Sequence, residues 1–333
     1  MVKFINLDRH WKEVGSKVQT IADNTYQKGL CQKSPLLEEI EDKISSIVNK
    51  RYAITFSSCT DALTQGLRNL NLPRESEILV PDYTYIATLN SIKLAGYVPI
   101  LVDVDNFYHI NLLDAQTKIN NKTRAILYVT LLGSPAHENI DEWCNKNNLT
   151  LVEDAAQSFG TSLANSKFSV LSFSPSKPCT TFGSGGALVT NDIQTASQAI
   201  KTRLQGDDKN IGINSMLSTF EASALKVNLD LIDIHLSRRR EIVEKYFMEL
   251  PSIYNFPKYR KNCTYSKFII QTQDRDKIKK YLDKKQIQTM IHYNKEFNLE
   301  NSKKLGKCSL TLPNCSYMSD KEVEEVIQCL KEF

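Results

Sequence analysis

The chain has 333 residues, enough to build one large hydrophobic core and a smaller appended domain. Hydrophobic residues make up 41% of it and charged residues 24%, as in soluble globular proteins, and no apolar run approaches the roughly 20 residues that cross a bilayer. The net charge of +4 is spread along the chain, which favours a small anionic ligand over nucleic acid. We therefore expect neither a membrane nor a nucleic-acid partner.

The first residues, MVKFINLDRHWKEV, lack the apolar stretch and the small-residue cleavage site of a signal peptide, which predicts a cytoplasmic protein. The eight cysteines include no C-x-x-C pair and no histidine partner at zinc spacing, and the five histidines form no HExxH pattern. We therefore expect reduced thiols and no metal site.

Apolar strands alternate with helical patterns through the first half of the chain. Residues 34–49 carry leucine or isoleucine every three or four positions, and a strand then begins at Tyr52. Further strands are predicted in EILVP, VPILVDV, RAILYVTLL and LTLVEDA, with helical patterns in DALTQGLRNL, TYIATLNSIKLAG, residues 112–119 and ENIDEWCNKN. Strands separated by crossover helices predict an α/β fold with a mostly parallel sheet, covered by helices on both faces.

After Asp154 the pattern changes to shorter pieces, FSVLSFS and GALVTN, which we expect to be antiparallel and joined by the loop PSKPCTTFGSG. A long helical pattern runs from about Thr219 to Leu250. The rest predicts a strand in YSKFIIQT, a helix in RDKIKKYLDKKQ, a strand in IQTMIHY and a final helix in KEVEEVIQCLKEF. We expect a large domain over residues 1–235 and a small C-terminal α+β domain over residues 236–333.

Polar residues stand out at several predicted strand ends and turns. Asp154 ends an apolar strand, where a carboxylate can pair with a protonated pyridine nitrogen, orient a base or cap the next helix. Lys177 lies between a strand and a glycine-rich turn, where partial burial would lower its pKa and permit imine chemistry, although most loop lysines lie on the surface. The turn at Thr60 and Asp61 can gather N–H and hydroxyl groups around a phosphate, with Ser172 as another donor, and a helix-capping role for Thr60 stays open.

Taken in order, the segments SSCTDAL, VPDYTYIATLNSI, VEDAAQSFG, SFSPSKPCTTFGSGGALVTND and GINSMLSTFEASAL resemble the DegT/DnrJ/StrS family of nucleotide-sugar aminotransferases. The similarity runs from about Gly29 to His292 and is most specific from Leu151 to Asp192. Members of this family are fold-type I pyridoxal-phosphate enzymes with the aspartate-aminotransferase-like fold. They act on nucleotide-linked keto sugars and are usually homodimers with shared active sites.

The resemblance implies a role for each residue around the cofactor, pyridoxal 5'-phosphate. Lys177 forms the internal Schiff base and later moves the proton between cofactor and sugar carbons. Asp154 pairs with the pyridinium nitrogen, which lets the ring accept electrons from the cleaved C–H bond. Gln157 hydrogen-bonds the phenolic oxygen, and Tyr85 stacks on the ring.

The resemblance also assigns the phosphate and substrate contacts. Thr60, Asp61 and Ser172 match the phosphate cup. Asn214 matches an asparagine that reaches the phosphate from the partner subunit of a homodimer. His292 and Tyr293 resemble a segment that faces the substrate, although a buried His-Tyr pair at a strand end is an equally good interpretation.

Three positions depart from the family pattern. Cys59 replaces a glycine in the phosphate turn, so that turn must accommodate a side chain. Pro178 replaces the asparagine that often follows the lysine. Met216 stands where many relatives have arginine, which puts a sugar or nucleotide contact on that side in doubt.

The lysine at position 177 favours transamination, because relatives that dehydrate sugars carry histidine there. We expect an amino group to move from an amino acid, by family habit L-glutamate, to a nucleotide-diphosphate keto sugar of the 4-keto-6-deoxy class, giving an amino sugar for surface glycans or glycoconjugates. A 3-keto sugar and a non-catalytic sensory or binding protein of the same fold are the alternatives. An amino-acid aminotransferase is disfavoured, because Arg260 and Arg275 are the only small-domain arginines after the long helix and neither is a convincing carboxylate clamp.

Overall fold

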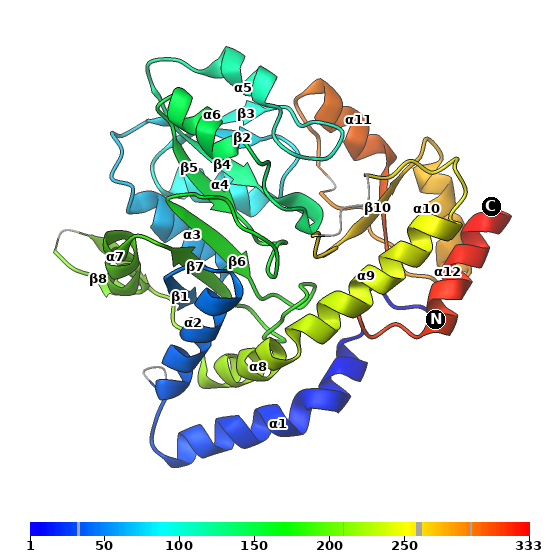
Figure 1. The fold of residues 1–333 in the computed structure, drawn as a ribbon, viewed down its shortest axis with the longest axis horizontal. Helices are drawn as coiled ribbons and strands as arrows, with labels where there is room; N and C mark the ends of the chain where they lie inside the picture. Colours follow the sequence, from blue (N-terminus) through cyan, green and yellow to red (C-terminus); the bar gives the residue numbers. More distant parts are fainter. Residues whose placement is uncertain (32–33, 209, 258–261, 294) are drawn as a thin grey trace.

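The computed structural model describes residues 1–31, 34–208, 210–257, 262–293 and 295–333. A seven-stranded sheet with the order β1-β7-β6-β5-β4-β2-β3 forms its centre (Figure 1). The strands are β1 (Tyr52–Phe56), β2 (Glu77–Pro81), β3 (Val98–Val102), β4 (Thr123–Val129), β5 (Thr150–Asp154), β6 (Phe168–Ser172) and β7 (Gly186–Thr190). Neighbouring strands are parallel from β3 to β6, and β7 is antiparallel to both of its neighbours. The α/β fold with a mostly parallel sheet is confirmed.

The predicted antiparallel pair FSVLSFS and GALVTN is confirmed as β6 and β7. The segment FSVLSFS forms β6, which is parallel to β5 and antiparallel only to β7. Residues 155–167 carry the chain back across the sheet without a regular helix, which allows β6 to run parallel to β5.

Helices cover both faces of the sheet. Because successive side chains of a strand point to opposite faces, neighbouring apolar residues pack against different helices. Leu188 packs in a core with residues of α3 and α4, whereas its neighbour Val189 packs in a core with residues of α2 and α8. The helices of this part are α1 (Leu7–Gln27), α2 (Pro35–Ile47), α3 (Cys59–Arg68), α4 (Ile86–Leu94), α5 (Leu112–Lys118), α6 (Ile140–Lys146), α7 (Ile193–Arg203) and α8 (Thr219–Asp230), with the single 3-10 turn η1 (Leu131–Gly133) and the hairpin β8 (Leu204–Gly206) and β9 (Ile211–Asn214).

The predicted long helix over 219–250 is two helices, because the helical geometry breaks at Leu231. The helix α8 begins with a capping box in which Ser218 and Glu221 satisfy each other's backbone N–H groups, and α9 (Ile232–Glu249) continues toward the C-terminal part. The sequence analysis did not predict α1, which lies along α8 and packs Val14 and Val18 against it (Figure 1).

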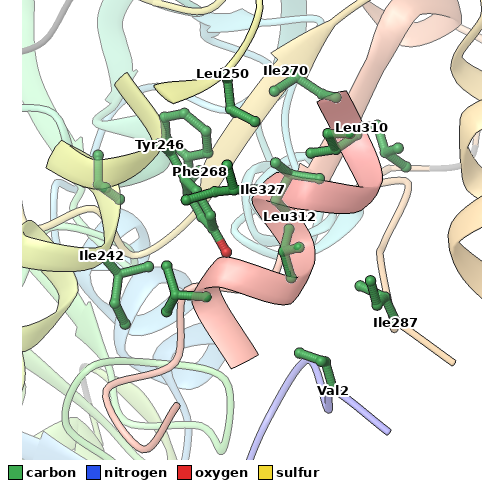
Figure 2. Packing of buried hydrophobic residues seen from close by; sticks show 14 of the residues in the cluster. Val2, Ile242, Tyr246, Leu250, Phe268, Ile270, Ile287, Leu310, Leu312 and Ile327 are labelled. Atoms are coloured by element: carbon green, nitrogen blue, oxygen red, sulfur yellow. The ribbon is translucent and has the colours of Figure 1, made fainter. Parts of the chain in front are cut away.

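The C-terminal part has its own hydrophobic core, shown in Figure 2. It is built from α9, β10 (Phe268–Gln271), α10 (Arg275–Lys284), β11 (Ser309–Leu312) and α12 (Asp320–Glu332), and α11 (Glu300–Cys308) precedes β11. Val2 also lies in this core, and it forms a bridge with Ile287. This core takes its α9 residues from beyond Leu236, which still packs in the core of the large part, and it also takes Val2 from the N-terminus; the division near residue 235 stays a prediction.

The prediction of a strand in IQTMIHY is wrong. This segment makes only single bridges, from Ile287 to Val2 and from Met290 to Thr311. It changes partner within three residues, so no ladder forms, and Tyr293 then turns the chain with a φ of 59°. The strand that pairs with β10 is instead β11, which was not predicted although SLTL alternates polar and apolar residues and Pro313 and Asn314 follow it.

All eight cysteines are free thiols. Within the part of the chain that the structure describes, no helix is long and apolar enough to span a bilayer.

Candidate active site

A pocket of about 490 Å³ opens at the carboxyl ends of β4, β5 and β6. Parallel α/β sheets place their ligand sites at this edge, because the loops that follow the strands converge there. The pocket is completed by the first turns of α3 and α4, the loop that follows β6 and the irregular segment before α11. Eight of the residues singled out from the sequence line it: Thr60, Tyr85, Asp154, Gln157, Ser172, Lys177, His292 and Tyr293.

Asp154 is the last residue of β5, and its carboxylate is buried at the base of the pocket. One carboxylate oxygen accepts a hydrogen bond from the Thr88 hydroxyl at 2.9 Å and the other from the Ala156 N–H at 3.2 Å. Burial raises the pKa of this carboxyl, while these donors and the Lys177 ammonium oppose the shift. The sequence did not indicate Thr88, which lies in the first turn of α4 and orients the carboxylate.

Lys177 is half-buried in the loop between β6 and β7 and reaches the same pocket. Burial lowers the pKa of its ammonium group, and the Asp154 carboxylate opposes that shift. Among the described residues, no hydrogen bond or ion pair of the Lys177 amine is recorded. Lys177 is therefore a confined amine with a lowered pKa, the state in which lysine forms imines.

Gln157 links the two sides of the pocket. Its side-chain oxygen accepts a hydrogen bond from the Leu132 N–H at 2.9 Å, which leaves the amide nitrogen to face the pocket, where it donates to the Tyr293 hydroxyl at 2.8 Å. Tyr85, at the N-cap of α4, is 59% exposed and lies with its ring centroid 6.1 Å from that of Tyr293. An exposed ring at the pocket mouth is available to cover a flat ligand.

Hydroxyl groups gather at the α3 end of the pocket, from Ser58, Thr60, Ser172, Ser174 and Ser184. Ser58 rather than Thr60 is the N-cap of α3, and its hydroxyl accepts a hydrogen bond from the Asp61 N–H at 3.0 Å. The Thr60 hydroxyl is thus not needed as the cap.

The Cys59 side chain fits this turn without strain. Cys59 is the first residue of α3 and is absent from the residues with positive φ. The close approach is made at Gly186 instead, where an added Cβ would lie 2.3 Å from the Cys59 nitrogen. A side chain at position 186, and not at 59, would displace the turn.

Two predicted cofactor residues do not line the pocket of this chain. The Asp61 carboxylate faces away from it and accepts hydrogen bonds from the hydroxyls of Ser57 and Ser215, at 2.9 and 2.8 Å. Asn214 ends β9 and is exposed, in the hairpin whose strand β8 lies at the edge of the molecule (Figure 1). Met216, where relatives carry arginine, is buried in the core between the sheet and α8.

His292 and Lys267 form the wall opposite α4. The His292 Nδ1 lies 2.8 Å from the Thr311 hydroxyl. Burial of the ring is the largest cause that lowers its pKa, to about 3, and the positive charges of Lys267 and Lys177 lower it further. Lys267 is 5% exposed and donates to the Ser176 carbonyl at 3.0 Å. Sequence reasoning missed Lys267, although a lysine directly before the apolar run FII was a signal that a charge enters the core.

The small-domain arginines do not reach the pocket as far as the structure describes them. Arg275 is held by Asp276 at 2.8 Å and by the Gly306 carbonyl at 2.5 Å. Arg260 lies outside the described residues. Nor do the described residues contain a group of three histidine, cysteine or acidic side chains that could hold a metal ion.

Residues 13–331 match the DegT/DnrJ/EryC1/StrS aminotransferase family. The chain belongs to this family. It is 29% identical to dTDP-3-amino-3,6-dideoxy-alpha-D-galactopyranose transaminase from Aneurinibacillus thermoaerophilus over 100% of this chain and 99% of that protein. It is 28% identical to UDP-2-acetamido-2-deoxy-3-oxo-D-glucuronate aminotransferase from Pseudomonas aeruginosa over 88% of this chain and 86% of that protein. The crystal structure of S. venezuelae DesV in complex with a ketimine intermediate superposes with a TM-score of 0.94, at 26% identity over 99% of this chain and 98% of that chain.

The family and the fold make the protein a pyridoxal-phosphate-dependent sugar aminotransferase. The pocket fits this cofactor at three points. A buried carboxylate, Asp154, lies at its base, a confined amine, Lys177, lies at its side, and a group of hydroxyls lies where α3 begins. These are the groups needed for a protonated pyridine nitrogen, an aldehyde and a phosphate.

Proposed function

We propose that this aminotransferase moves an amino group from L-glutamate to a keto sugar linked to a nucleotide diphosphate, in the cytoplasm, and so supplies an amino sugar for surface glycans or glycoconjugates. The 4-keto-6-deoxy class is the substrate that the family resemblance favours. The names of the two relatives, 3-oxo-D-glucuronate aminotransferase and 3-amino-3,6-dideoxy transaminase, favour a 3-keto sugar as the second candidate. The observation that carries the proposal is the meeting of Lys177 and Asp154 in one pocket at the strand ends.

Four residues are proposed to act at the cofactor ring. Pyridoxal phosphate, when bound, supplies an acceptor for the electron pair left at carbon when a proton departs. Lys177 holds it covalently, and its free amine then takes a proton from the donor's α-carbon and returns one in the sugar half-reaction. Asp154 keeps the ring nitrogen protonated, Gln157 donates its amide N–H to the phenolic oxygen, and Tyr85 covers the exposed face.

The phosphate is proposed to bind at the start of α3, to Thr60, Asp61 and Ser172, with Asn214 contributed by the partner subunit of a homodimer. Asp61 would act indirectly, because its carboxylate accepts hydrogen bonds from the Ser57 and Ser215 hydroxyls and so holds the turn in place. His292 and Tyr293 are proposed to contact the sugar. His292 would do so as a neutral imidazole, because its pKa is lowered to about 3.

A homodimer is supported by apolar side chains exposed near Asn214 and at the pocket mouth. Ile211 is 79% exposed on the strand that ends at Asn214, and Phe220 and Ile86 are 40% and 47% exposed. Exposed large hydrophobic side chains that flank a predicted intersubunit contact are typical of a surface that a second subunit covers.

The experiment that tests the function measures both half-reactions. Holoenzyme is incubated with L-glutamate and 2-oxoglutarate is quantified, and the amine-loaded enzyme is then offered nucleotide-linked 4-keto-6-deoxy and 3-keto sugars. Mass spectrometry detects the amino sugar, and NMR identifies the carbon that carries nitrogen. Formation of a 4-amino product supports the first candidate, and a 3-amino product supports the second.

A non-catalytic sensory protein would give a different result. It would release no 2-oxo acid from any amino donor, even after loading with pyridoxal phosphate. In that event the aminotransferase proposal is wrong for this chain, and binding of the nucleotide sugar alone becomes the property to measure.

A further inference from the structure

A second, smaller cavity lies behind the loop that carries Lys177. Its volume is about 20 Å³, and it is lined by the start of α1, residues 175–178, Arg239 of α9, Lys267 and residues 314–317. A cavity of about this size holds one occupant close to water in size. Ser176, Lys177 and Lys267 line both this cavity and the active-site pocket, so the loop and the Lys267 side chain separate the two.

Two cationic side chains face this cavity without a carboxylate. Arg239 and Lys267 are 6% and 5% exposed, no aspartate or glutamate lines the cavity, and neither side chain forms an ion pair with a described residue. Burial lowers the pKa of Lys267, and the charges of Lys177 and Arg239 lower it further. Buried charges of one sign are costly unless an opposite charge accompanies them.

The hydrogen-bonding capacity of these groups is also unfilled. Among the described residues, the Arg239 guanidinium makes only two long hydrogen bonds, to the carbonyls of Ser266 and Asn314 at 3.4 and 3.3 Å, and its Nε has no acceptor. Asn6 lines the cavity at 1% exposure, and neither its side-chain oxygen nor its nitrogen has a partner. Unpartnered buried polar atoms in a folded protein indicate an occupant that bonds to them.

The N-terminus of α1 adds a positive potential to the same place. Asn6 is the N-cap of this helix of 21 residues, and its side chain makes no capping hydrogen bond. Leu7, the first helical residue, also lines the cavity. Backbone N–H groups at the start of a helix favour an anion, and here they lie with two buried cations and an unpartnered amide.

We propose that this cavity is a binding site for one small monovalent inorganic anion of the halide class, held by Arg239, Lys267 and the Asn6 amide at the start of α1. A water molecule would satisfy the polar atoms but would leave the buried Arg239 charge without a counter-charge, and it would not support a proton on Lys267, whose pKa burial lowers well below its usual value. Phosphate or a carboxylate substrate, with several heavy atoms, does not fit in about 20 Å³. The anion stabilises the loop from the side opposite the substrate, because Lys267 also donates to the Ser176 carbonyl.

The first test is crystallographic. Crystals of the holoenzyme are soaked in sodium bromide, and anomalous scattering is recorded at the bromine edge. The proposal expects a bromide peak between Arg239 and Lys267. Occupation of the cavity by water alone, with bromide peaks only at the protein surface, overturns it.

The second test is the thermal unfolding of the holoenzyme in sodium chloride, with sodium gluconate replacing chloride at constant ionic strength. An anion that binds only the folded state gives a melting temperature that rises with the logarithm of its concentration once this exceeds the dissociation constant, by about 2 °C at tenfold excess. Arg239→Met is expected to remove this rise. Arg238→Met is the matched control on the same helix, because Arg238 pairs with Asp320 outside the cavity, and it is expected to keep the rise. Equal chloride responses in the two variants overturn the proposal, and if Arg239→Met fails to fold, Asn6→Leu takes its place in the same comparison.

Discussion

The two halves of the active-site pocket are built in different ways. The half that holds Asp154 and Ser172 consists of strand ends in a continuous parallel ladder, where each residue's position follows from the register of its neighbours. The half that holds His292 and Tyr293 follows a segment joined to the rest only by single bridges. The difference indicates a rigid half, which is proposed to hold the cofactor, and an irregular half in which substrate preference can change without loss of the sheet.

The largest effect is expected in the rigid half, from Lys177→Ala. Removing the amine takes away both the covalent attachment and the proton carrier, so transamination falls by at least about a thousandfold. Borohydride reduction of the wild-type holoenzyme, followed by peptide mass spectrometry, identifies the attached lysine. Lys17→Ala, an exposed lysine of α1, is the control and keeps full activity. Attachment to a peptide without Lys177 contradicts the assignment.

Asp154→Asn is expected to have the next largest effect. The amide keeps the size of the side chain and an oxygen for the Thr88 hydroxyl, but it loses the charge that holds the ring nitrogen protonated, so kcat falls about a hundredfold or more. Steady-state kinetics at saturating cofactor measure this fall in kcat, with Asp23→Asn, at an exposed aspartate, as the control.

Thr88→Val leaves the Asp154 carboxylate charged but less well oriented, so kcat is expected to fall about tenfold. An active Asp154→Asn enzyme would show that the carboxylate only supports the fold.

The same contrast explains how much the sequence could predict. Asp154 could be predicted because it is the polar residue that ends an apolar run, which marks the end of a strand. The parallel pairing of β5 and β6 then brings the end of β6 beside it. Lys267 and Thr88 were missed, because their contacts with Ser176 and Asp154 join residues 91 and 66 positions apart and leave no periodic signal.

The irregular half could not be predicted from local patterns at all. The segment IQTMIHY has the β-branched and apolar residues of a strand, but its partners are Val2 and Thr311, from opposite ends of the chain. The β-strand propensity of these residues therefore indicated an extended backbone, but not which strand they would pair with, because strand pairing depends on tertiary contacts. The helix α1 was missed although its apolar positions have helical spacing, because they are few and separated by many polar residues.

Tyr293→Phe tests the irregular half and is expected to act on substrate binding. The hydroxyl, which accepts a hydrogen bond from the Gln157 amide, is proposed to contact the sugar, and losing one hydrogen bond to the sugar costs about 1 kcal/mol, or roughly a fivefold rise in KM with little change in kcat. Exposed Tyr26→Phe serves as the control and keeps the wild-type KM. A fall in kcat with KM unchanged would place Tyr293 in the rigid, cofactor-holding half instead.

The smallest effect is expected from His292→Gln, and it appears in stability against pH. Burial, Lys267 and Lys177 lower the pKa of His292 from 6.5 to about 3 in the folded protein. Between these values the unfolded chain binds a proton that the folded chain does not, so stability is lost as pH falls below 6.5. Half-burial of the side chain reduces this loss between pH 7 and 5 to about 1 kcal/mol.

His292→Gln should therefore shrink the drop in melting temperature between pH 7 and pH 5 by about 2 °C. It should not abolish the drop, because the pKa of His235 is also lowered by burial, to about 4, and that residue stays. His137→Gln, at an exposed histidine, should leave the drop unchanged. An unchanged drop in His292→Gln would mean that the imidazole is open to water, and the irregular half would then be less closed than its contacts with Thr311 and Lys267 indicate.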